Sequence, residues 1–212
     1  MPDPNTTLMQ SIHAKWGSAI AAACARMTLH SGQATVPPAF LAALVAGESG
    51  GDPDAKRFEK AVLADLWEVL QGRKALYGSI NRDAILAFLA AAAPGNPIVP
   101  SAGFVRSIIA SALQQLDGLA TSWGLTQVMG YEAIAFSTSL SALEDSASEL
   151  QCSLRMLADF ARRFTLDPAK NSPELFSCWN TGRAHARTAD PQYVPNGLAR
   201  MQIYQQLVIG TS

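Results

Sequence analysis

Residues 37–53 read PPAFLAALVAGESGGDP, and this stretch predicts one buried helix together with its start and its end. Proline is tolerated in the first turn of a helix, so Pro37 and Pro38 are expected to open it. Two glycines and a proline follow Glu48 and Ser49, and they stop the helix in a turn. We therefore expect the carboxyl group of Glu48 to lie at a helix end, against a loop. The expected buried face consists of apolar residues at helical spacing: Phe40, Leu41, Leu44 and Val45.

Helices are expected along most of the remaining chain, because alanine is abundant and no strand pattern of convincing length is present. Asn81 is an expected N-cap, and Ser141 with Glu144 fits a capping box at the start of a long helix. The glycine-rich segment 121–130 predicts a loop with one or two helical turns. The predicted fold class is therefore all-α. The expected helices cover residues 12–27, 38–48, 58–72, 81–93, 104–119, 141–164, 172–180 and 191–208.

The composition indicates one folded domain over residues 1–212. Hydrophobic residues make up 49% of the chain and charged residues 16%, whereas an ordinary domain has about 25% charged residues, so intrinsic disorder is excluded. The 16 basic and 17 acidic residues give a net charge of -1, which provides no field for gathering nucleic acid. No run approaches the roughly 18 consecutive apolar residues of a membrane span. We expect a monomer with no membrane span and no nucleic-acid partner.

The cysteine pattern gives no metal or redox site. Cys24, Cys152 and Cys178 lack C-x-x-C spacing, and they lie far in the sequence from the histidines. Buried free thiols in a reducing compartment are the first expectation, and a disulfide between Cys152 and Cys178 is the alternative. No metal and no organic cofactor is therefore expected.

The N-terminal sequence does not have the pattern of a secretion signal. It begins Met1-Pro-Asp-Pro and carries no basic residue before His13 and Lys15. Its apolar stretch from Gly17 to Ala25 is rich in alanine rather than leucine. We expect no classical signal peptide, and synthesis in the cytoplasm.

Four short motifs follow one another on segments predicted as helix ends or loops. They are Glu48-Ser-Gly-Gly, Gly124-Leu-Thr-Gln-Val-Met, Trp179-Asn-Thr-Gly and Tyr193-Val. In this order they resemble the Glu-Ser, Gly-Leu-Met-Gln, Tyr-Asn-Ala-Gly and late Tyr-Val motifs of the lysozyme-like lytic transglycosylases, a superfamily that includes the goose-type lysozymes. Residues 60–120 have no match, so we expect them to form a helical insertion in a single lysozyme-like domain, as a lid or a wall of the substrate groove.

The chain departs from the family pattern at several motif positions. Thr126 stands in place of Met, Trp179 in place of Tyr, and Thr181 in place of Ala. Pro195 follows the late Tyr-Val, where the family usually continues with a polar helix. These departures concern the preference for particular sugar subsites more than the acid itself.

The resemblance implies peptidoglycan glycan strands as the substrate and Glu48 as the general acid for the MurNAc–GlcNAc β-1,4 bond. Such an acid must stay protonated near neutral pH, which desolvation and the partial negative charge of a helix C-terminus both favour. Polar caps and core aromatics are the structural alternatives for the other matched side chains. The residues expected at the substrate are Ser49, Glu59, Gln127, Met129, Trp179, Asn180 and Tyr193, and this tyrosine can hydrogen-bond the acid.

A second carboxylate would decide the product. An inverting hydrolase needs it roughly 6.5–9.5 Å from the acid, and a retaining one roughly 5–5.5 Å. Asp52, Asp54 and Glu59 are the candidates, although both aspartates also suit the turn around Pro53. Without a second carboxylate, the resemblance implies that the 6-hydroxyl of the substrate closes on the anomeric carbon and gives a 1,6-anhydro sugar. We expect a lytic transglycosylase, with a muramidase, a silent glycan-binding or assembly module, and a chitin hydrolase as alternatives.

A basic loop beside Asn180 has two interpretations. Arg183, His185 and Arg187 either bind the carboxylates of peptide stems or form a solvated loop. A cell-wall substrate and the expected lack of a signal peptide together imply non-classical delivery to the cell wall or periplasm. Export or lysis machinery, such as a phage lysis system or a dedicated secretion machine, would be the partner.

Overall fold

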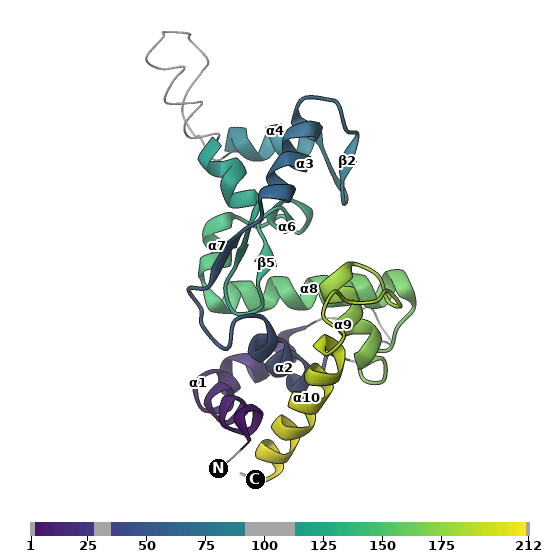
Figure 1. Cartoon of the computed structure of the whole chain (residues 1–212). Helices are drawn as coiled ribbons and strands as arrows, with labels where there is room; N and C mark the ends of the chain where they lie inside the picture. Colours follow the sequence, from purple (N-terminus) through teal and green to yellow (C-terminus); the bar gives the residue numbers. More distant parts are fainter. Residues whose placement is uncertain (1–2, 28–34, 92–112, 211–212) are drawn as a thin grey trace. The chain divides into compact units, whose positions relative to one another are not determined.

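The computed structural model describes residues 3–27, 35–91 and 113–210, and helices dominate these residues (Figure 1). The predicted all-α class is confirmed. The chain forms two compact units: unit 1 comprises Met1–Ala55, Gly124–Thr126 and Asp145–Ser212, and unit 2 comprises Lys56–Trp123 and Gln127–Glu144. The helix predicted for 104–119 lies outside the described residues up to position 112, and residues 113–119 are helical. No helix in the described ranges is long and apolar enough to cross a membrane.

Unit 1 is built around α2 (Pro38–Glu48), which packs against α1 (Pro4–Arg26) and α10 (Tyr193–Gly210) and lies between them in Figure 1. Every residue of α2 from position 39 to 46 is buried. A helix that is apolar on all sides is a core helix. The predicted start at Pro38 and end at Glu48 are both confirmed. The remaining helices of the unit are α8 (Ser146–Phe164) and α9 (Ser172–Thr181).

Close packing in unit 1 depends on aromatic rings and small residues. Phe40 of α2 stacks on Phe176 of α9, with ring centroids 4.3 Å apart. A Cβ atom at Gly197 of α10 would lie 2.8 Å from the ring of Phe176, so α10 can approach α9 only with glycine at this position. Burial of these rings contributes roughly 2–3 kcal/mol each. The three cysteines are buried and form no disulfide with one another, so the alternative of a Cys152–Cys178 disulfide is wrong: Cys24, Cys152 and Cys178.

Unit 2 combines short helices with two small antiparallel sheets. One sheet has the strand order β1 (Lys56–Phe58), β4 (Thr121–Trp123) and β5 (Val128–Met129). The other pairs β2 (Leu76–Tyr77) with β3 (Ile80–Asn81). The helices of this unit include α3 (Lys60–Leu70), α4 (Arg82–Ala91), α6 (Glu132–Ala135) and α7 (Leu140–Glu144). The buried core of this unit consists of Leu66, Val69, Ile80, Ile85, Leu116, Leu119 and Ala120.

The prediction of helical turns in segment 121–130 was wrong, because this segment contains β4 and β5. Trp123 pairs with Val128 across the two strands, and Ser122 pairs with Met129. The chain reverses between them through Gly124 at φ 74° and Gln127 at φ 57°. Residues of a right-handed helix have negative φ angles, so a helix cannot run through Gly124 and Gln127.

The prediction of one long helix from Ser141 to Phe164 was also wrong at its start. Helix α7 ends at Glu144, and α8 begins at Ser146. Asp145 separates the two helices: its backbone is extended, and its carboxylate accepts a hydrogen bond from the Ser148 backbone N–H at 2.9 Å. An N-cap carboxylate satisfies a free N–H and fixes the helix start at that residue. Helical spacing in the sequence also predicts a core stripe for this helix, formed by Leu150, Leu154, Leu157, Ala161 and Phe164. The first four are fully buried, whereas Phe164 is half-buried.

Other predicted helix boundaries agree more closely with the structure. Asn81 caps α4, since its Oδ1 accepts a hydrogen bond from the Ala84 N–H at 2.8 Å. Helix α9 ends at Thr181, and Gly182 follows it in the left-handed conformation at φ 73°. Helix α3 begins at Lys60, two residues later than predicted, because residues 56–58 pair with β4 instead.

Candidate functional site

The candidate acid Glu48 is the last residue of α2 and lies beside the start of α10. The hydroxyl of Tyr193 donates a hydrogen bond to Glu48 Oε1, which joins residues 145 positions apart in the sequence. Both side chains are half-buried. The ring of Tyr193 also meets the edge of Phe176 with centroids 6.3 Å apart, so the phenol is held by the core of unit 1. The first and last of the sequence motifs are thus in direct contact.

The phenol of Tyr193 is a neutral donor throughout the physiological pH range. Burial raises its pKa, and the nearby Glu48 carboxylate raises the pKa further because a phenolate would be repelled by it. The guanidinium of Arg200 acts in the opposite direction, but its effect is smaller. A neutral phenol can hydrogen-bond either the protonated or the ionised form of Glu48.

Ser49 fixes the turn that follows Glu48. Its hydroxyl donates to the carbonyl oxygen of Leu125 at 2.7 Å, and its Oγ accepts a hydrogen bond from the Gly51 N–H at 3.1 Å. The indole N–H of Trp16 donates to the carbonyl oxygen of Gly51 at 3.0 Å. A Cβ at Gly51 would lie 2.5 Å from Ile12, and its φ of 86° is unfavourable for other residues, so this position requires glycine.

Asp52 and Asp54 are both exposed and belong to the same turn. Asp52 Oδ1 accepts a hydrogen bond from the Asp54 backbone N–H at 3.0 Å. This is the local geometry by which aspartate stabilises a turn. The carboxylate of Asp52 is therefore engaged in backbone structure.

Three of the predicted substrate residues belong to unit 2. Glu59 precedes α3, and its Oε1 accepts a hydrogen bond from Arg57 Nε at 2.5 Å in an ion pair. Gln127 Oε1 accepts a hydrogen bond from the Ser122 hydroxyl at 2.7 Å. Met129 lies half-buried on β5. These side chains are therefore anchored by β1, β4 and β5 of their own unit.

The two predicted residues on α9 lie in the same unit as Glu48. Trp179 is half-buried and packs against the core of unit 1, whereas Asn180 is exposed near the C-terminal end of the helix.

In unit 2, the indole of Trp123 donates to the carbonyl oxygen of Gly118 at 2.9 Å. The ammonium group of Lys56 lies 4.3 Å from the Trp123 ring centroid. Both tryptophans therefore have structural contacts of their own.

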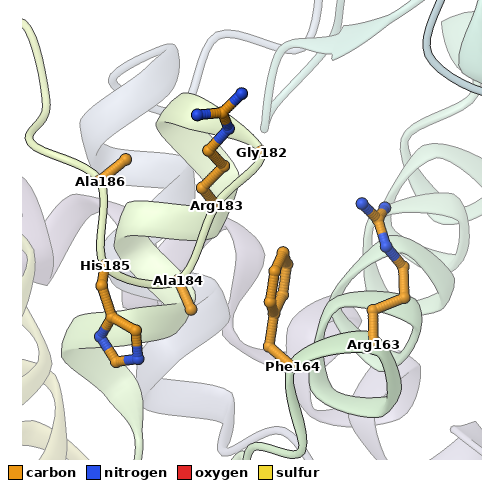
Figure 2. Close-up of a pocket in the computed structure, with 7 residues that line it drawn as sticks. All are labelled: Arg163, Phe164, Gly182, Arg183, Ala184, His185 and Ala186. Atoms are coloured by element: carbon orange, nitrogen blue, oxygen red, sulfur yellow. The ribbon is translucent and has the colours of Figure 1, made fainter.

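A basic hollow with a volume of about 600 Å³ lies between the C-terminal ends of α8 and α9. Figure 2 shows the guanidinium groups of Arg163 and Arg183 extending to the same side, with the ring of Phe164 between them, while His185 points away. Arg163 also pairs with Asp159 at 3.3 Å. The lining residues include basic side chains and no acidic one: Arg163, Phe164, Gly182, Arg183, Ala184, His185 and Ala186.

Glu149 on α8 is a buried carboxyl group that the sequence interpretation missed. Its side chain is 0% exposed, and burial raises its pKa to about 7. Thr126 donates to Glu149 Oε1 through both its backbone N–H, at 2.9 Å, and its hydroxyl. The available signal in the sequence was the spacing of Glu149 and Ser153, which are four residues apart beside the predicted core stripe.

Within the described ranges of the chain, no cluster of three or more His, Cys, Asp or Glu side chains could hold a metal ion. No protein-family model matches the sequence, and no curated protein does. Among solved structures, the chain is similar to the crystal structure of Burkholderia AP3 phage endolysin, at 18% sequence identity and a TM-score of 0.46. This similarity covers 97% of the present chain and 74% of that chain. A similarity of this size assigns neither a family nor an activity.

Proposed function

We propose that the protein is a lytic transglycosylase with a lysozyme-like domain, which cleaves the MurNAc–GlcNAc β-1,4 bond of peptidoglycan with Glu48 as its general acid. The observation that carries this proposal is the hydrogen bond from Tyr193 to Glu48 at the end of a fully apolar helix. It joins two of the motifs that resemble that superfamily. Delivery to the cell wall by export or lysis machinery is part of the same proposal.

The surroundings of Glu48 suit an acid that delivers a proton. Glu48 is the last residue of α2, and its half-buried carboxyl group lies beside the hydroxyl of Tyr193. When Oε1 accepts the Tyr193 hydroxyl, the acid proton of Glu48 resides on the other carboxyl oxygen. That proton passes to the leaving glycosidic oxygen as the bond to the anomeric carbon breaks. The ionised Glu48 then takes the proton of the 6-hydroxyl as that oxygen bonds to the anomeric carbon, which restores the acid and gives the 1,6-anhydro sugar.

Two of the three candidate second carboxylates are engaged in other contacts, which favours a mechanism with a single acid. Asp52 is engaged in its turn, and the carboxylate of Glu59 is paired with Arg57, whereas Asp54 is exposed and stays a candidate. A hydrolase needs a carboxylate that is available to water or to the anomeric carbon. Intramolecular attack by the 6-hydroxyl needs no such group.

The basic hollow provides a place for the stem peptides that MurNAc carries. Two guanidinium groups on the same side can bind a carboxylate with charge-assisted hydrogen bonds. The volume of about 600 Å³ is within the range of ligand pockets. We therefore propose that Arg163 and Arg183 bind a stem carboxylate, while Trp179 and Asn180 of α9 contact the glycan.

The test of the main proposal is digestion of purified peptidoglycan by the unmodified protein and by Glu48→Gln, with mass spectrometry of the released ends. Anhydro ends that depend on Glu48 support the transglycosylase, whereas reducing ends would identify a muramidase. If the unmodified protein leaves peptidoglycan intact, both enzyme assignments are wrong. The matched control is Glu174→Gln, which changes another half-buried glutamate of unit 1 and should leave the products unchanged.

The stem-peptide proposal has a separate test. Arg183→Gln should raise KM about tenfold on peptidoglycan with intact stems, because one charge-assisted contact is lost. The same variant should behave like the unmodified protein on glycan strands stripped of peptides. Arg187→Gln is the control, since this exposed arginine does not line the hollow. An equal change on both substrates would show that Arg183 does not bind the stem.

A further inference from the structure

The carboxyl group of Glu149 is the most unusual polar group in the described part of unit 1. Its Oε1 accepts two hydrogen bonds from Thr126, whereas its Oε2 is buried and has no hydrogen-bond partner among the described residues. A buried polar atom without a partner costs about 1–3 kcal/mol. Such a group needs an explanation in a folded protein.

The hydrogen bonds of Glu149 lead to the residue that follows the candidate acid. Thr126 Oγ1 also lies 2.6 Å from Ser153 Oγ, which donates to the carbonyl oxygen of Glu149 at 2.9 Å. Leu125, the neighbour of Thr126, is fully buried, and its carbonyl oxygen accepts the hydroxyl of Ser49 at 2.7 Å. Segment 124–126 is therefore bound to Glu149 through Thr126 and to Ser49 through Leu125.

Burial and the hydrogen bonds from Thr126 are the causes that shift the pKa of Glu149. Burial raises its pKa to about 7, and the two hydrogen bonds from Thr126 lower the pKa by less. Helices α1 and α9 pack against α8. None of their titratable groups is a cause of this shift, namely His13, Lys15, Cys24 and Arg26 of α1, and Glu174 and Cys178 of α9. Among the described residues, no charged side chain is therefore a cause that would favour an ionised Glu149.

We propose that Glu149 is a positioning residue: its neutral form holds segment 124–126, and through it Ser49, beside the acid Glu48. This inference rests on the proposed function for its effect on catalysis. The neutral carboxyl group accepts both bonds from Thr126 and leaves no charge in the dry interior. Ionisation places a charge there that Thr126 alone must stabilise. Segment 124–126 then opens to admit water, and Ser49 loses the carbonyl oxygen of Leu125 as an acceptor and keeps only the longer contact with Val45 at 3.3 Å.

Hydrogen exchange tests the positioning without any substrate. We compare the unmodified protein with Glu149→Gln, which keeps a carbonyl acceptor for Thr126 and cannot ionise. After correction for the intrinsic pH dependence, amides of residues 124–126 should exchange about tenfold faster at pH 8 than at pH 6 in the unmodified protein, because the ionised fraction of a group with a pKa of about 7 rises from about one tenth to about nine tenths over this interval. In Glu149→Gln the corrected rates should be equal. Equal rates in both proteins would overturn the proposal.

Activity provides the second readout and separates this inference from the proposed function. In Glu149→Gln the alkaline limb of the pH profile of kcat should move to higher pH, while the acidic limb stays at the same pH. A merely structural role would change the rate at all pH values and leave the limbs unmoved, which would overturn the proposal. If the unmodified protein cleaves no peptidoglycan, the proposed function fails, and the exchange experiment still decides whether Glu149 holds the segment. Glu174→Gln again serves as the control and should match the unmodified protein in both experiments.

Discussion

Two glutamates of unit 1 accept hydroxyl hydrogen bonds on Oε1, yet their surroundings suit different tasks. Glu48 is half-buried at a helix end and is bonded by the phenol of Tyr193. Glu149 is fully buried near the start of α8 and is bonded by Thr126. Only the carboxyl group of Glu48 is partly open to solvent. Under the two proposals, burial and access, rather than the hydroxyl partner, separate the carboxyl group that delivers a proton from the one that holds a segment in place.

Loss of the acid at Glu48 should have the largest effect. Glu48→Gln keeps the acceptor for Tyr193 but removes the proton, so kcat should fall by about 10³-fold, within the range expected for a general acid. Circular dichroism and thermal unfolding should match those of the unmodified protein, because the amide has the same shape. Muropeptide release measures the rate. A variant that retains more than a tenth of the activity would show that Glu48 is not the acid.

Local sequence signals predicted the two helices that carry these glutamates, α2 and α8, well. The limits of α2 follow from a double proline and a double glycine, and the core stripe of α8 follows from helical spacing. These signals depend on neighbours within a few residues. The contact of Tyr193 with Glu48 spans 145 positions, and only the order of the motifs pointed to it.

The parts that sequence could not predict depend on distant partners. Strand β4 exists because Ser122 pairs with Arg57 of β1, and no local alternation marks so short a strand. Glu149 is buried, and its carboxyl group accepts hydrogen bonds from Thr126, 23 positions earlier in the sequence, whereas an isolated glutamate is expected at the surface. Asp145 also divides the single helix that was predicted for residues 141–164. Both Ser141 and Asp145 are residue types that can cap the start of a helix.

The next largest effect is expected at Glu149, in the way the free energy of unfolding changes with pH. Its folded-state pKa of about 7 exceeds the ordinary 4.5, so the folded state binds more protons and loses stability as the pH rises from about 4.5 to 7. The loss is about 3 kcal/mol and is constant above that window. Glu149→Gln lacks this loss. Denaturant unfolding of both proteins should therefore show the variant gaining about 3 kcal/mol relative to the unmodified protein between pH 4 and pH 8, and a constant difference would contradict the assignment.

Tyr193→Phe should have a smaller effect on the Glu48 side of the comparison. The phenylalanine ring keeps the edge contact with Phe176, so the free energy of unfolding should change by about 1 kcal/mol or less. The carboxyl group of Glu48 loses the donor that orients it, and kcat should fall about tenfold. Steady-state release of muropeptides measures this. An unchanged kcat would show that the phenol does not orient the acid.

The smallest effect is expected at Glu59, the second carboxylate that the resemblance offered. Its ion pair with Arg57 is largely open to solvent, with side chains 33% and 71% exposed, and such a pair contributes about 0–1 kcal/mol. If Glu48 works alone, Glu59→Gln should leave both the anhydro product and, within about twofold, the rate unchanged. A switch from anhydro to reducing ends, or a loss as large as that of Glu48→Gln, would instead make Glu59 a participant in the chemistry. Exposure would then be a poor guide to which carboxylate acts, and the difference in burial between Glu48 and Glu149 would not be enough to assign their roles.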